Sequence, residues 1–166
     1  MTFTSQMQTA LAEARAAAAR GEVPVGALVT GPDGRILSQA GNRMRELNDP
    51  TAHAEMLAIR AACAATGSER LTGCDLYVTL EPCPMCAAAI AFARIRRLYY
   101  GAQDPKSGGI AQGPRIFAHP QCHHVPEVID GLCATEAARL LSDFFARRRG
   151  CSKNKKTTAF RSQSML

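Results

Sequence analysis

The stretch CDLYVTLEPCPMCAAAIAFARI, residues 74–95, contains the pattern that decides the fold. Residues 74–80 are rich in β-branched, aromatic and aliphatic side chains, which is typical of a buried strand. Pro84 then opens a helical segment over 84–95, because proline is tolerated in the first turn of a helix, where its missing N–H group is not needed. Residues 96–102, RRLYYGA, indicate another strand. Strands alternating with helices predict an α/β fold.

Further helices and strands are expected on both sides of this stretch. The segments are a helix at 4–20, strands at 24–30 and 35–41 around a Gly-Pro-Asp-Gly turn, a helix at 52–67 that stops at Gly67, and an amphipathic helix at 134–149 with Leu140, Leu141, Phe144 and Phe145 on or near its apolar side. Together they predict one α/β domain over residues 1–150, a layered sheet covered by helices on both faces.

Composition indicates an ordinary cytoplasmic protein without a membrane partner. No segment approaches the about eighteen consecutive apolar residues of a membrane-spanning helix. The first 22 residues have no basic start followed by an apolar core, so they read as a helix and not as a signal peptide. The seven cysteines are an odd number, which argues against a complete disulfide framework and fits a reducing compartment.

Positive charge is concentrated at the C-terminal end. The net charge is +6, yet residues 1–144 hold 13 Lys/Arg and 14 Asp/Glu, while residues 145–166 hold seven Lys/Arg and no acid. This pattern is typical of a solvated helix end with a disordered tail, or of an arm that binds a polyanion such as nucleic acid. Residues 151–166 show no periodicity and are expected to form a basic, flexible C-terminal tail.

Cys83 and Cys86 leave three interpretations open on their own: a redox pair, half of a structural zinc site, or two ligands of a catalytic metal. His53, at the start of another predicted helix, favours the third. Cysteines at i and i+3 share one side of a helical turn, and the positive end of a helix favours thiolates. Two thiolates and one imidazole would bind one Zn²⁺ per subunit and leave its fourth position to water or hydroxide. Glu55 is then free to act as general acid and base.

A structural zinc site with four protein ligands is the alternative. Cys122, His123 and His124 could supply its further ligands. The remaining cysteines are expected to pack as small apolar side chains. They are Cys63, Cys74, Cys133 and Cys151.

His53-Ala54-Glu55 together with Pro82-Cys83-Pro84-Met85-Cys86 resembles the signature of the zinc-dependent nucleoside and nucleobase deaminases. Within that superfamily, residues 7–150 are similar to the bacterial tRNA-specific adenosine deaminases. The resemblance implies a cytidine-deaminase-like three-layer α/β/α sandwich with a five-stranded mixed sheet. It also implies a homodimer that deaminates adenosine to inosine at the wobble position (34) of a tRNA anticodon. The similar stretches are EVPVGA, GNR, NDPTAHAE, LYVTLEPCPMCAAAI, YGAQDPKSG and LLSDFFARRR.

The resemblance also implies residue roles. Glu55 would move protons between water, the base and the departing ammonia, while the metal is held by His53, Cys83 and Cys86. Substrate-binding positions that match the family are Asn42, Pro24, Val25 and Ala54 around the base, Asp104 and Lys106 at the anticodon loop, and Phe145, Arg147 and Arg149 on the closing helix. Two alternatives remain: a free nucleobase or nucleoside deaminase, such as guanine or cytosine deaminase, and a zinc-stabilised RNA-binding subunit without activity.

Overall fold

The computed structural model describes residues 5–161, with side chains over 5–150. The predicted α/β sandwich with a five-stranded mixed sheet is confirmed. In chain order the elements are α1 (Met7–Ala19), β1 (Gly26–Thr30), β2 (Ile36–Gly41), α2 (Met44–Leu47), α3 (Ala54–Thr66), β3 (Asp75–Leu80), α4 (Pro84–Phe92), β4 (Arg97–Ala102), the 3-10 turn η1 (Ile116–Ala118), β5 (Glu127–Ile129) and α5 (Ala134–Arg161).

The sheet order is β2-β1-β3-β4-β5, and β3 is its central strand. β1 pairs antiparallel with both β2 and β3, so β2 and β3 run in the same direction. β3, β4 and β5 are parallel to one another. The β2-α3-β3 and β3-α4-β4 segments are therefore two crossover connections between parallel strands. This topology brings the first turns of α3 and α4 to the same edge of the sheet.

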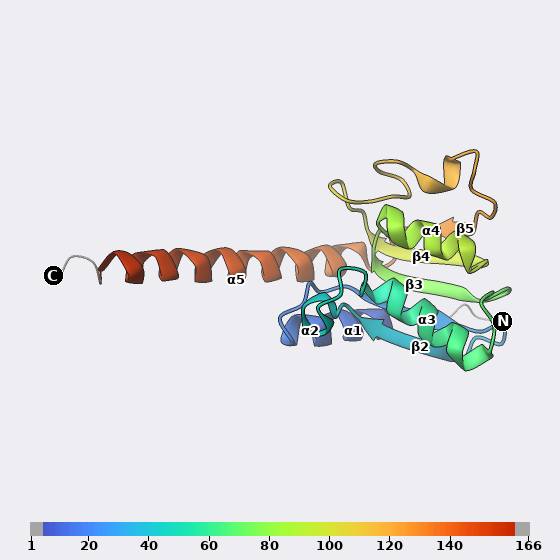
Figure 1. Cartoon of the computed structure of the whole chain (residues 1–166), viewed down its shortest axis with the longest axis horizontal. Helices are drawn as coiled ribbons and strands as arrows, with labels where there is room; N and C mark the ends of the chain where they lie inside the picture. The colour runs from blue at the N-terminus through green and yellow to red at the C-terminus, as the bar shows by residue number, and fades with distance from the viewer. Residues whose placement is uncertain (1–4, 162–166) are drawn as a thin grey trace.

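Two apolar clusters cover the two faces of the sheet because successive strand residues point to opposite sides. On one face, Leu76 and Val78 of β3 pack with buried residues of α3 and α4, such as Ala58 and Ile90. On the other face, Tyr77 packs with residues of α1 and α5. Its ring stacks on that of its register partner Tyr99, with centroids 4.4 Å apart. The helices therefore form two outer layers around the sheet (Figure 1).

α5 extends further than the sequence pattern predicts. It packs against α1 and β4 near its start and then projects away from the sheet, on the side where α2 lies (Figure 1). Its helix runs through Gly150 to Arg161, whereas the sequence pattern predicts that the helix ends at residue 149. The flexibility expected of the tail from residue 151 stays a prediction. Residues 162–166 lie outside the described part. The division at residue 150 therefore stays a prediction.

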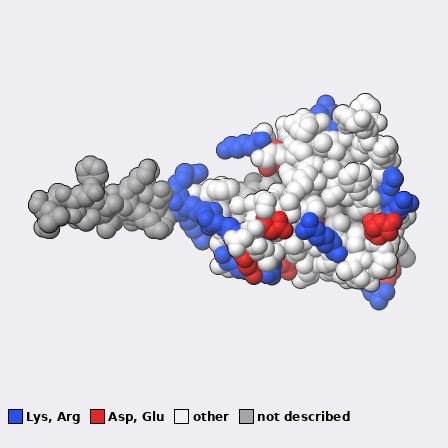
Figure 2. Space-filling model, viewed as in Figure 1, with Lys and Arg blue, Asp and Glu red and all other residues white. Residues whose placement is uncertain are grey.

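Cationic side chains gather at the base of the projecting helix, where the described surface meets the grey atoms in Figure 2. Arg15, Arg147 and Arg148 line a cavity of about 470 Å³ between α1 and α5. Arg15 also forms an ion pair with Glu136 across the two helices. No helix within residues 5–161 has both the length and the apolar character needed to cross a membrane.

Candidate metal centre and active-site cavity

The two crossovers place the metal-ligating side chains next to each other. His53 is the extended residue that precedes α3, and Cys83 is the corresponding residue before α4. Pro84 occupies the first turn of α4, as the sequence predicts, and Cys86 lies on the same turn. Residues 30 positions apart in the chain thereby meet because both helices start at the same edge of the sheet.

The three side chains converge on a common point. Nδ1 of His53 lies 3.7 Å from Sγ of Cys83 and 3.6 Å from Sγ of Cys86. Zinc bonds of about 2.3 Å to sulfur and about 2.0 Å to nitrogen, at a tetrahedral angle, would separate the two ligand atoms by about 3.6 Å. Among the described residues, this is the one group whose ligand atoms all lie within 4.8 Å of one another. The donor set and its spacing therefore fit Zn²⁺.

The electrostatic surroundings of Cys83 and Cys86 favour the thiolate form of at least one of the two cysteines. The Cys86 thiol donates a hydrogen bond to the Cys83 sulfur, and this bond and the neighbouring His53 lower the pKa of Cys83 to about 4. The same interaction with Cys83, together with burial, raises the pKa of Cys86. A dication placed between the two sulfurs would deprotonate both.

Glu55 lies in the first turn of α3, two residues after the metal ligand His53. Its side chain is buried, with 4% of the residue exposed, and this desolvation raises the pKa of its carboxyl to about 7. Glu55 and His53 share a cavity of about 180 Å³ with Cys83. A buried carboxyl group with a raised pKa thus faces the same space as the candidate metal ligands His53 and Cys83.

Asn42, Val25 and Asp104 line this cavity. Asn42 is buried, and its Oδ1 accepts a 2.8 Å hydrogen bond from the backbone N–H of Ala54. The Ala54 N–H is thus already paired, so a contact between this group and the substrate would have to replace this bond. Pro24 is buried beside the cavity without being part of its lining.

Apart from Asp104, the residues predicted to contact RNA do not line the cavity. Lys106 is exposed on the loop that follows β4. Phe145, Arg147 and Arg149 are exposed on α5, and the ring of Phe145 packs edge-on against Phe144. These residues are therefore free to meet a ligand that extends beyond the cavity.

The cavity also contains residues that the sequence pattern does not single out. They are Val23, Met44, Leu80, Glu81 and Ser107. Met44 belongs to the short helix α2, whose N–H groups at Arg45 and Glu46 donate to the buried carboxylate of Glu22. In the sequence, the feature that could have pointed to Glu22 and Glu81 is that each is an acidic residue next to an apolar stretch.

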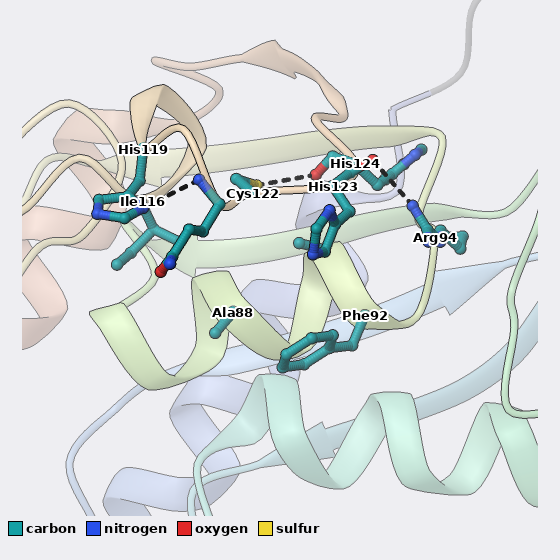
Figure 3. Close-up of a pocket in the computed structure, with 10 residues that line it drawn as sticks. Ala88, Phe92, Arg94, Ile116, His119, Cys122, His123 and His124 are labelled. Atoms are coloured by element: carbon teal, nitrogen blue, oxygen red, sulfur yellow. Dashed lines mark hydrogen bonds between the residues drawn. The ribbon is translucent and has the colours of Figure 1, made fainter.

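Cys122, His123 and His124 do not join the metal ligands. They line a separate cavity of about 270 Å³ beside the second half of α4, over Ala88 and Phe92 (Figure 3). Cys122 Sγ donates to the carbonyl of His124, and His124 Nε2 donates to the carbonyl of Ile95 at 2.6 Å. The four-ligand structural zinc site is therefore not formed by these residues.

Three metal-ligating atoms beside a buried carboxylate, in a cavity at one edge of a sheet, define a metal-dependent hydrolytic site. Residues 2–102 match the family model of the cytidine and deoxycytidylate deaminase zinc-binding region, and the chain belongs to this deaminase family.

The chain resembles characterised members along most of its length. It is 60% identical over 146 residues to a tRNA-specific adenosine deaminase of Agrobacterium fabrum, which covers 88% of this chain and 95% of that protein. A solved structure from studies of A-to-I editing by tRNA:A34 deaminases matches with a TM-score of 0.80 and 62% identity, over 81% of this chain and 97% of that one. A guanine deaminase from Bacillus subtilis matches with a TM-score of 0.61 and 32% identity, over 90% and 95%.

Proposed function

We propose that this chain is a zinc-dependent hydrolase that converts adenosine to inosine at position 34, the wobble position, of a tRNA anticodon. The observation that carries the proposal is the 60% identity to a tRNA-specific adenosine deaminase over nearly the full length of both chains. The match to a guanine deaminase is at 32% identity, so it supports the free-base alternative less well.

Each side chain at the metal centre has a defined task in this reaction. His53, Cys83 and Cys86 would hold the metal, which when bound would supply a Lewis acid that makes hydroxide available near neutral pH. Glu55 would take one proton from water and pass it to a ring nitrogen of adenine as the water oxygen forms a bond to C6. Glu55 would then take the remaining hydroxyl proton and pass it to the C6 amine, and the C6–N bond breaks to release ammonia. Water and adenosine thereby give inosine and ammonia.

The size of the cavity supports a flipped base as the bound group. Its volume of about 180 Å³ lies below the about 300–1,000 Å³ of pockets that hold drug-sized ligands. A base turned out of the anticodon loop would enter it, as in other enzymes that modify nucleobases. Asn42 would then donate from its amide group to the nucleotide, beside Val25, Pro24 and Ala54.

The rest of the anticodon stem-loop would lie outside the cavity. Asp104 lines the cavity, Lys106 is exposed on the same loop, and Arg147 and Arg149 on α5 would supply positive charge for the phosphates. The exposed ring of Phe145 offers a surface on which an unpaired base can stack. We also propose a homodimer, on the resemblance to the family, and a cytoplasmic location, where tRNA is found. Residues 1–150 would form the deaminase domain and 151–166 a basic extension.

An anticodon stem-loop with its adenosine moved by one position tests the proposal. One RNA carries adenosine at position 34, and a matched control carries guanosine at 34 and adenosine at 35. The proposal predicts inosine in the first RNA and none in the second. Equal conversion of both RNAs would contradict wobble specificity, and conversion of neither would contradict the RNA substrate.

A further inference from the structure

Glu81 is a buried acid for which the proposed chemistry has no use. It immediately follows β3 and precedes Pro82, and only 2% of the residue is exposed. Its side chain lies at the cavity that also contains Glu55 and Asp104. A carboxylate so deeply buried is costly unless hydrogen bonds compensate for the lost hydration.

The compensation comes from the backbone of one loop. Oε2 of Glu81 accepts a 3.0 Å hydrogen bond from the N–H of Asp104. Oε1 accepts three more from consecutive residues, Ile110 at 3.1 Å, Ala111 at 2.8 Å and Gln112 at 3.0 Å. Successive N–H groups that converge on one anion form a concave binding arrangement of the kind that holds phosphates. Here the anion is a side chain of the protein itself, so both ends of the loop are held by one carboxylate.

The loop packs against this carboxylate without spare room. A Cβ atom added at Gly108 would lie 2.6 Å from the carboxyl carbon of Glu81 and 2.6 Å from the carbonyl oxygen of Asp104. The Gly109 N–H donates to the carbonyl of Pro82 at 2.8 Å, next to the metal ligand Cys83. Glycines at both positions therefore allow the loop to approach the start of α4.

The loop in turn supplies part of the cavity wall. Asp104 and Ser107 line the cavity together with Val25 and Asn42. Oδ1 of Asp104 accepts hydrogen bonds from the N–H groups of Lys106 and Ser107, which shapes the turn that presents Ser107. Displacement of the Asp104 backbone would therefore move both wall residues together.

We infer that Glu81 is a positioning residue that fixes loop 104–112 as a wall of the substrate cavity and thereby sets the affinity for the nucleotide. The inference rests on the proposed function, because it assumes that the nucleotide enters this cavity. Glu81 acts through the loop, whereas Glu55 acts on the reacting atoms.

The Glu81→Gln variant tests this role with little change in shape. A glutamine retains one acceptor oxygen, but its NH₂ group must face a backbone N–H donor, so one end of the loop is released. We expect amide hydrogen exchange, measured by NMR on the zinc-loaded chain, to speed up by about tenfold or more at the four donor residues. We expect KM for the stem-loop to rise by about tenfold or more while kcat changes much less, because contacts made equally in the ground and transition states are lost.

Asp75→Asn is the matched control. Asp75 is also a buried carboxylate, but it lies at the opposite end of β3 and accepts two 2.8 Å hydrogen bonds from Arg96. This variant should leave exchange in loop 104–112 and KM unchanged. The same rise of KM in Asp75→Asn would show that Glu81 has no special role.

Gly108→Ala tests the same contact from the loop side and replaces the first variant if Glu81→Gln does not fold. Gly108→Ala should show the same faster amide hydrogen exchange in loop 104–112 and the same rise of KM as Glu81→Gln, and it should retain bound zinc. Amide hydrogen exchange at wild-type rates in loop 104–112 of the folded variant would refute the inference. Faster exchange in this loop with an unchanged KM would refute it as well. A wild-type chain that leaves the stem-loop unmodified would instead overturn the proposed function, while the exchange rates still report on the Glu81 contacts.

Discussion

Replacing Asn42 with alanine should destabilise the fold at the point where the metal ligands are held. Oδ1 of Asn42 accepts the N–H of Ala54, the first residue of α3, at 2.8 Å. Asn42 is buried, with 6% of the residue exposed, so water cannot easily take over this bond. A lost helix-capping bond costs about 0.5–2 kcal/mol, and an unpaired buried donor costs about 1–3 kcal/mol. We therefore expect Asn42→Ala to lower the free energy of unfolding by about 1–2 kcal/mol.

Urea unfolding at fixed zinc concentration measures this effect, and Gln39→Ala in β2, the strand that ends one residue before Asn42, is the control. Gln39 is exposed and bonds only to the side chain of Glu13 among the described contacts, so its loss should cost less than about 0.5 kcal/mol. Asn42→Asp keeps the acceptor oxygen but loses the amide donors, so it should recover much of the stability without recovering turnover. Unfolding of Asn42→Ala at the wild-type urea midpoint would refute the capping role.

Three further changes address the metal, the proton transfer and the RNA surface. Glu55→Gln should lower turnover by about 100-fold or more with zinc content unchanged, because the general acid and base is lost; turnover at the wild-type rate would contradict this role. Cys86→Ser should lower the zinc affinity by more than the loss of about 10- to 100-fold that is typical when a residue that only supports a metal ligand is replaced. Competition with a chromophoric chelator measures this affinity, and an unaltered value would place the metal elsewhere. The double variant Arg147→Ala and Arg149→Ala should weaken stem-loop binding and reduce the slope of log K against log salt by about 1–2, with zinc content unaffected; an unchanged slope would remove α5 from the RNA surface.

The metal ligands could be predicted from sequence because local rules fix their geometry. The spacing of Cys83 and Cys86 and the proline between them place two sulfurs on one helical turn. His53 precedes the helix whose end is marked by Gly67, which adopts φ of +65°. Because α3 and α4 start at the same edge of the sheet, His53 lies close to Cys83 and Cys86, and no further contact has to be predicted.

The loop anchored by Glu81 could not be predicted because its bonds join residues 23 to 31 positions apart. A pattern of helix or strand spacing contains no information about such a contact. The same holds for α2, which has only four residues and whose first N–H groups are capped by Glu22 from more than 20 positions away. β5 has three residues, too few for an alternating pattern. The end of α4 differs too: it stops at Phe92, not at 95, and Arg94 adopts a positive φ of 58°.

The most direct test of the central claim is a comparison of substrates with the zinc-loaded chain. A synthetic anticodon stem-loop with adenosine at position 34 is assayed beside free adenosine, guanine and cytidine, and deamination is read by mass spectrometry. The account predicts inosine in the stem-loop and no turnover of the free substrates. Turnover of free guanine or cytidine with an unmodified stem-loop would keep the metal chemistry of His53, Cys83 and Cys86 and contradict the RNA substrate.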